Sequence, residues 1–68
     1  MDERIENNFT YHPPKDGQHQ RYATLRETAK DFAYLVWDLC PESRERSLAM
    51  TKIEEAVMWA NEAIARNE

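Results

Sequence analysis

The chain of 68 residues is poor in the residues that cross-link or interrupt small proteins. It has one cysteine, Cys40, one glycine, Gly17, and three prolines. A single cysteine excludes an internal disulfide and is typical of a reducing, intracellular compartment. Zinc needs about four cysteine, histidine or carboxylate ligands at suitable spacing, and His12 and His19 with one distant cysteine do not supply them. The sequence therefore predicts no metal site and no cofactor.

Long apolar runs are also missing. No segment approaches the ~20 apolar residues that are needed to span a bilayer. The N-terminal stretch MDERIENN is acidic and polar, unlike a secretory signal peptide. We expect a soluble, cytoplasmic protein that does not contact a membrane.

Positive charge is scarce, and it is unevenly distributed. Nine Lys and Arg residues stand against thirteen Asp and Glu residues, which gives a net charge of −4. This balance argues against a partner such as DNA or RNA, because proteins that bind these polymers usually present a basic face. Residues 9–26 nevertheless carry a local excess of cations over their one acid, Asp16. A cationic spot on an acidic protein suits a small anion better than a long polyanion.

The motifs of common enzymes are absent. The sequence has no glycine-rich phosphate loop, no nucleophile elbow and no HExxH motif. Ser43 and Ser47 have no histidine nearby in the sequence, and Cys40 has no paired base, so we favour a structural role for this cysteine. The sequence predicts a protein that is not an enzyme.

Helical periodicity is the strongest signal that the chain does contain. Between residues 22 and 39, apolar residues recur at alternating intervals of three and four, which is an a/d heptad stripe. This stripe predicts a helix over residues 18–39. A second stripe of the same spacing lies between residues 50 and 64 and predicts a helix over residues 41–65, with Pro41 in its first turn.

The short connection between the two predicted helices determines the fold class. Helices joined so closely must fold back on each other as an antiparallel hairpin. Residues 1–17 would form an N-terminal arm, with a short helix near residues 2–8 capped by Asp2. We therefore predict an all-α protein with a single domain over residues 1–68.

Apolar residues outside the two stripes predict self-association. One stripe on each of two helices is too little core for a stable domain. Alanines recur every seven residues in the second helix, and small side chains let helices approach closely. Asn61, among apolar neighbours, could fix the register of an interface. We expect a helical homo-oligomer, although exposed single apolar residues are common. The off-stripe residues are Leu35, Trp37, Leu48, Met58 and Trp59.

The segment FTYHPPKDGQHQRY, residues 9–22, differs from the rest of the chain. Pro13 and Pro14 have no N–H group and force an extended conformation on His12. Gly17 permits a sharp turn before the first long helix. A stiffened arm loses less entropy when it binds a ligand, so the segment is a candidate binding site.

Aromatic and cationic side chains give this arm the chemistry for a nucleotide. Tyr11 and Phe9 offer faces on which a base can stack, for ~1–3 kcal/mol per base. His12 can form hydrogen bonds. The cations that can pair with phosphate are Lys15, Arg21 and Arg26.

Each of these residues also has a structural interpretation. Phe9 can cover the end of the hairpin core, which is the role we favour for it. Tyr22 begins the heptad stripe and so belongs to the core. Arg21 can form an ion pair within its own helix, and Lys15 can simply be solvated. Composition alone favours these structural roles over ligand binding.

The sequence resembles a family of phage proteins. The segments that carry the resemblance are FTYHPP and SLAMTKIEEAVMWANEAIARN, and the likeness extends from about Ile5 to Asn67. The chain is similar to the anti-CBASS cyclic-nucleotide sponges, whose helical hairpin domain is shared with some anti-Thoeris sponges. Members of this family assemble as hexamers and bind cyclic dinucleotides such as 3′,3′-cGAMP between protomers, and some bind cyclic trinucleotides at separate sites. They sequester the signal of the infected bacterial host without cleaving it.

The resemblance implies roles for particular residues. Tyr11 corresponds to the tyrosine that stacks on a base, and Arg26 is the best match for the cation that holds the phosphates. His12, Lys15 and Arg21 are secondary candidates for the same ligand. A trinucleotide site would involve Thr28 and Arg66.

A structural or protein-binding module remains the alternative function, because the same hairpin occurs as a domain of larger proteins. In that case the apolar faces would engage a host or phage protein, and the arm would only cap the helices.

Overall fold

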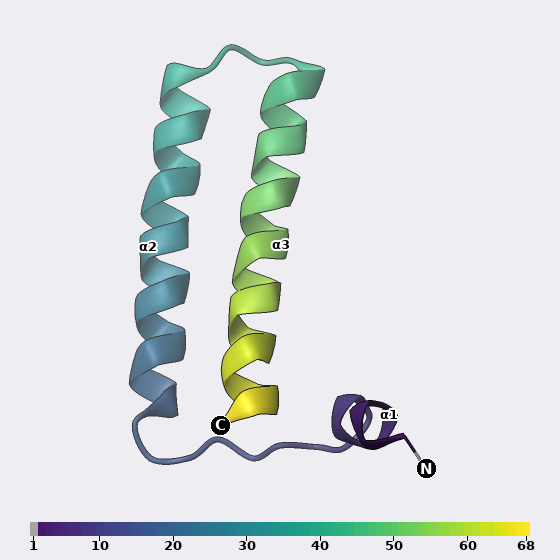
Figure 1. The fold of residues 1–68 in the computed structure, drawn as a ribbon. Coiled ribbons are helices and arrows are strands. Elements are labelled where there is room, and N and C mark those ends of the chain that lie inside the picture. Colours follow the sequence, from purple (N-terminus) through teal and green to yellow (C-terminus); the bar gives the residue numbers. More distant parts are fainter. Residues whose placement is uncertain (1) are drawn as a thin grey trace.

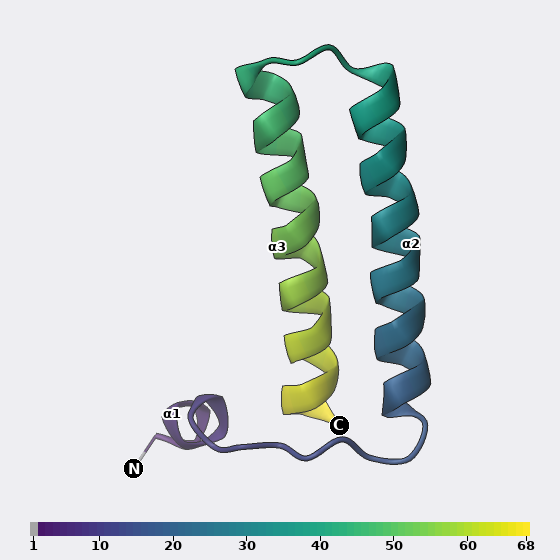
Figure 2. The same ribbon diagram turned by 180° about the vertical axis from the view of Figure 1, so that it is seen from behind.

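The computed structural model describes residues 2–68, which form three helices. These are α1 (Glu3–Asn8), α2 (Gln18–Leu39) and α3 (Arg44–Asn67). Helices α2 and α3 lie antiparallel as a hairpin, and the arm crosses below the open end to place α1 on the far side of α3 (Figures 1 and 2). The predicted all-α hairpin with a short N-terminal helix is confirmed. None of these helices is long and apolar enough to cross a membrane.

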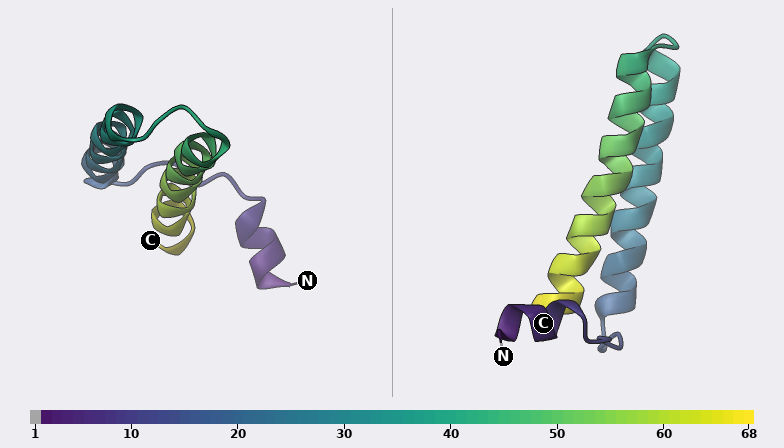
Figure 3. Two further views of the ribbon diagram at one scale, coloured as in Figure 1. Left: turned by 90° about the horizontal axis from the view of Figure 1, so that it is seen from above. Right: turned by 90° about the vertical axis from the view of Figure 1, so that its right-hand side faces the viewer.

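The hairpin is one helix thick. The principal extents of the described chain, with the arm and α1 included, are 48 × 27 × 12 Å, and the side view in Figure 3 shows the two long helices as a single layer. Within residues 2–68, no apolar side chain is buried. Even on the predicted stripe of α2, Phe32 and Leu39 remain more than half exposed. A single copy therefore buries far less apolar surface than a stable small domain requires.

A tight turn at Gly17 sets the direction of the arm. Gly17 has a φ of 85°, in the left-handed region that glycine tolerates without strain. The turn is closed by two opposed hydrogen bonds. The Gln18 N–H donates to the carbonyl oxygen of Lys15 at 3.1 Å, and the Lys15 N–H donates to Gln18 Oε1 at 2.9 Å. Gln18 is only 3% exposed, the one buried residue within residues 2–68.

Helix α3 begins later than predicted. We expected Pro41 in its first turn, but the helix begins at Arg44 and continues to Asn67. Ser43 is the N-cap, and its hydroxyl oxygen accepts a hydrogen bond from the N–H of Arg46 at 3.1 Å. The prediction was wrong because this serine satisfies an N–H group that would otherwise lack a partner, which a start at Pro41 would not do. The bounds of α2 agree with the predicted residues 18–39.

Arg46 closes the loop between the two long helices. Its Nη1 donates to the carbonyl oxygens of Trp37 and Cys40, at 3.4 and 3.3 Å, where α2 ends. Its guanidinium carbon lies 3.7 Å from the centre of the Trp37 ring. The cation thereby complements the negative end of the α2 dipole and stacks on an aromatic face.

A hydrogen bond attaches helix α1 to the end of α3. Asp2 caps it, accepting from the N–H of Arg4 at 2.8 Å, as predicted. The Asn7 side chain donates to the carbonyl oxygen of Arg66 at 3.1 Å. Phe9 follows α1 and is 87% exposed, so the interpretation that it covers the hairpin core is wrong. Phe9 does not line the groove between α2 and α3.

The turn at Gly17 generates a stability prediction. Gly17→Ala should destabilise the fold by about 1 kcal/mol, because alanine disfavours the left-handed conformation. A Cβ atom at this position would meet nothing within 4 Å, so the cost is conformational rather than steric. Thermal unfolding followed by circular dichroism measures the change. Gly17→Asn is the control and should lose less, and equal stability of all three proteins would contradict the prediction.

Candidate functional site

A polar hollow lies where the arm passes below the C-terminal end of α3. Its volume is about 650 Å³, within the range of about 300–1,000 Å³ that is usual for small-molecule sites. We call it the base hollow. It is lined by His12, Pro13, Pro14, Lys15, Gln18, Ala65, Arg66, Asn67 and Glu68.

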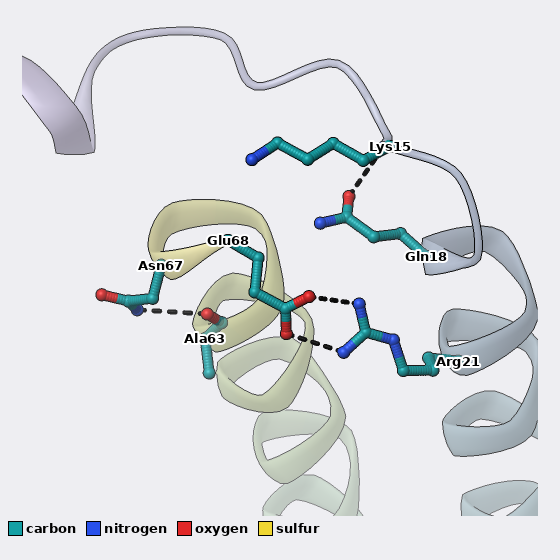
Figure 4. A network of polar contacts seen from close by, with 6 residues as sticks. All are labelled: Lys15, Gln18, Arg21, Ala63, Asn67 and Glu68. Atoms are coloured by element: carbon teal, nitrogen blue, oxygen red, sulfur yellow. Dashed lines mark hydrogen bonds and ion pairs between the residues drawn. The ribbon is translucent and has the colours of Figure 1, made fainter.

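A bidentate ion pair joins the two long helices beside this hollow. Arg21 Nη1 donates to Glu68 Oε2 at 2.7 Å, and Arg21 Nη2 donates to Glu68 Oε1 (Figure 4). The expectation that Arg21 pairs within its own helix is wrong, because its partner follows the last turn of α3. The antiparallel arrangement places the start of α2 beside the end of α3, which brings the two charges together.

The contact between Arg21 and Glu68 favours the charged form of each group: the pKa of Arg21 is raised and that of Glu68 is lowered, in both cases mainly by the hydrogen bond between them. The hydrogen bond from Arg21 is the main cause that lowers the pKa of the Glu68 carboxyl from its ordinary value, and the charge of Arg21 adds to it. Gln18 and Lys15 lower the pKa of Glu68 further, through a hydrogen bond and a positive charge. In Figure 4 the Lys15 side chain extends over the end of α3, and the Gln18 side chain lies between Lys15 and the ion pair.

His12 is fixed in place by the arm itself. Its Nε2 atom lies 2.9 Å from the carbonyl oxygen of Asn7. Because a carbonyl oxygen only accepts, Nε2 carries the proton. Asn7 in turn donates to the backbone of Arg66, so a short series of hydrogen bonds connects the arm, α1 and α3.

The local excess of cations that the sequence predicts is partly neutralised in the fold. Arg21 pairs with Glu68, and Arg66 Nε lies 2.6 Å from Glu62 Oε2 one turn earlier in α3. Lys15 and Arg26 take part in none of the three ion pairs within residues 2–68. Neither of these two cations is therefore neutralised by a carboxylate within the described residues.

The fold brings some predicted site residues together and separates others. His12, Lys15 and Arg66 line the base hollow, and Arg21 reaches it through Glu68. Tyr11 is 81% exposed and does not line the hollow, nor does the exposed Phe9.

The predicted residues on the middle of α2 lie away from the base. Arg26 is about 12 Å along the helix from Gln18, at 1.5 Å per residue. Thr28 lines a different surface from Arg66, so one hairpin does not bring the proposed trinucleotide residues together. Tyr11 and Arg26 likewise form no shared site within one hairpin that the structure records.

An apolar groove, also of about 650 Å³, runs between α2 and α3. Alanines form much of its wall, and Thr28 and Lys52 are its polar residues. The other residues that line it are Leu25, Ala29, Phe32, Val36, Ala49, Ile53, Ala56, Val57 and Ala60. We call this surface the apolar groove.

Three residues at the base were not predicted from the sequence. Gln18 closes the turn, Glu68 pairs with Arg21, and the Asn67 side chain donates to the carbonyl oxygen of Ala63 at 3.1 Å (Figure 4). Opposite charges at the start of one helix and the end of its antiparallel partner were a usable signal for the Arg21–Glu68 pair. Nothing in the local sequence marks Gln18 for burial.

The fold and its base define a helical hairpin domain that carries an N-terminal arm. A family model described as "Acb2/Tad1, hairpin domain" matches residues 1–65, and the chain therefore belongs to the Acb2/Tad1 hairpin-domain family. This agrees with the resemblance drawn from the sequence. Comparisons with curated proteins and with solved structures gave no match. Residues 2–68 contain no group of three or more His, Cys, Asp or Glu side chains placed to hold a metal ion.

The ion pair at the base predicts a titration. Glu68 should titrate below its ordinary pKa of 4.5, and its midpoint should rise towards that value in Arg21→Gln. Because the folded pKa is lowered, the stabilisation by this pair is present above the unfolded pKa and is lost as the pH falls through the folded pKa. Carbon-detected NMR of the Glu68 side-chain carboxyl group follows the midpoint. An unchanged midpoint in Arg21→Gln would contradict the assigned cause.

Proposed function

We propose that the protein is a phage anti-defence sponge for cyclic dinucleotides such as 3′,3′-cGAMP. It binds the signal without cleaving it and thereby withholds it from the CBASS effector in the cytoplasm of the infected bacterium. The observation that carries the proposal is the match of residues 1–65 to the Acb2/Tad1 hairpin domain, the family that the arm motif FTYHPP also resembles. Affinity comes from base stacking and phosphate pairing.

Exposed groups on the arm and on α2 supply these interactions. Tyr11 presents most of its surface to solvent beside the stiff Pro13–Pro14 pair, so its ring is accessible to a base. Arg26 is exposed and forms none of the ion pairs within residues 2–68, so a phosphate need not displace a carboxylate from it. Base stacking is worth ~1–3 kcal/mol and tolerates either purine.

Self-association completes the binding site in this proposal. A single hairpin has no buried apolar residue among those described, and the apolar groove lies open along it. The alanines of the groove allow the helix of a second copy to approach closely. Tyr11 and Arg26 line none of the three pockets described on one hairpin, so we place a ligand that contacts both between copies. Thr28 and Arg66 would form a cyclic-trinucleotide site in the same way, and the family resemblance implies a hexamer.

The assembly predicts the effect of a charge in the apolar groove. Ala56→Glu keeps a good helix former but places a carboxylate on the apolar surface, so the oligomer should dissociate. Sedimentation equilibrium should show the wild-type chain as an oligomer and this variant as a smaller species. Glu54→Ala, an exposed site on the same helix outside the groove, is the control and should remain assembled. A monomeric wild-type chain would contradict the prediction.

Two substitutions test the ligand contacts. Tyr11→Ala and Arg26→Ala should each weaken binding of 3′,3′-cGAMP by roughly 10- to 100-fold, since stacking and charged hydrogen bonds are each worth ~1–3 kcal/mol. Isothermal titration calorimetry measures the affinity, and sedimentation checks that each variant remains assembled. The wild-type ligand is chosen first by thermal shift against a panel of cyclic di- and trinucleotides.

The control for the ligand contacts is Tyr34→Ala, which removes an exposed tyrosine from the middle of α2 and should bind as the wild type does. Unchanged affinity in both Tyr11→Ala and Arg26→Ala would contradict the assigned contacts. Chromatography of the ligand released by denaturation should recover it intact, because the proposal involves no cleavage.

The open apolar groove also favours a second candidate function, a module that binds another protein. In that case the groove would hold a helix of a host or phage protein instead of a second copy. A chain that stays monomeric and whose melting temperature no cyclic nucleotide raises would favour this function over the sponge.

A further inference from the structure

We propose that the base hollow binds a phosphate group of the ligand, and that Glu68 is an internal competitor which the phosphate displaces from Arg21. The inference rests on the proposed function, because the phosphate is that of a bound cyclic nucleotide. In the absence of ligand Arg21 pairs with the Glu68 side chain, and a bound anion replaces the Glu68 carboxylate.

The Arg21–Glu68 contact has the geometry of a phosphate contact. Two guanidinium N–H groups donate in parallel to the two carboxylate oxygens. Arginine binds two oxygens of a phosphate with the same planar fork. The carboxylate therefore occupies the position that two phosphate oxygens would take beside the base hollow.

The surroundings of Glu68 suit a group with more charge and more volume than a carboxylate. Lys15 lines the base hollow and forms none of the ion pairs within residues 2–68, and its charge acts on Glu68. His12 and the buried Gln18 line the same hollow. A hollow of about 650 Å³ accommodates a phosphate together with part of a nucleoside.

Glu68 can leave without unfolding the hairpin. Its side chain and that of Arg21 are 43% and 48% exposed, and ion pairs between such exposed groups change an equilibrium by no more than about fivefold. The turn that positions Lys15 and Gln18 is made by backbone and amide groups and does not involve Glu68. Rotation of the Glu68 side chain therefore opens the site. The apparent affinity for the phosphate is reduced in proportion to the fraction of molecules in which Arg21 is free of Glu68.

A double-mutant cycle tests the competition. Isothermal titration calorimetry at pH 7 with 3′,3′-cGAMP compares the wild type with Glu68→Gln, Arg21→Gln and the double variant. Glu68→Gln should bind about two- to fivefold more tightly, because the competing charge is gone. Arg21→Gln should bind more weakly, and the gain from Glu68→Gln should disappear in the double variant, since the two side chains act on one contact.

Glu42→Gln is the matched control. It removes the same charge from the loop at the opposite end of the hairpin, and its affinity should equal that of the wild type. Weaker or equal binding by Glu68→Gln overturns the proposal, and so does a gain that persists without Arg21, because it would then arise from net charge alone.

A probe without a base distinguishes failure of the proposed function from failure of the phosphate site. If no cyclic nucleotide binds, pyrophosphate is titrated while the Arg21 Nε–Hε signal is followed by NMR, the signal being assigned by its loss in Arg21→Gln. A shift that saturates at lower pyrophosphate concentration in Glu68→Gln than in the wild type supports the phosphate site. No shift in either protein overturns it.

Discussion

The thinness of the hairpin is the constraint on which the rest of the structure depends. Two helices side by side make a layer without an interior, so no apolar residue among residues 2–68 is buried. The polar contacts between the two long helices lie at the two ends of the hairpin, where Arg46 closes the loop and Arg21 joins Glu68 at the base. Exposed polar contacts of this kind contribute little stability. Apolar surface buried against the open faces would therefore add more stability than these end contacts do.

The two ends of the hairpin differ in the contacts that the chain makes there. At the loop, Arg46 satisfies carbonyl oxygens of α2 and stacks on the Trp37 ring. At the base, the start of α2, the end of α3 and the arm converge around a hollow. The positive end of α2 and the negative end of α3 lie next to each other there, and Glu68 and Arg66 carry the complementary charges. The base thus combines charged groups of both signs with a hollow.

Local signals in the sequence predicted the helices. The contacts between residues that lie far apart in the chain were not predicted. The heptad stripe and Gly17 defined α2, and Asp2 marked the short helix, because each of these acts within a few residues. The start of α3 was misplaced since the cap at Ser43 competes with the proline signal, and only the folded loop decides between them. The partner of Arg21 depends on the register of two antiparallel helices. The exposure of Phe9 depends on the path of the arm. Neither is encoded in a local pattern.

A ligand held by Tyr11 of one copy and Arg26 of another would have a thermodynamic consequence. Such a ligand bridges two copies, so it binds the assembly better than the single chain. By linkage, the ligand must then stabilise the assembly by as much as assembly improves ligand affinity. A hairpin without a buried core is suited to this coupling, because its apolar surface remains available for contacts between copies. Marginal stability of the single chain and tight capture of a small messenger would then have the same physical origin, the apolar surface that one copy leaves exposed.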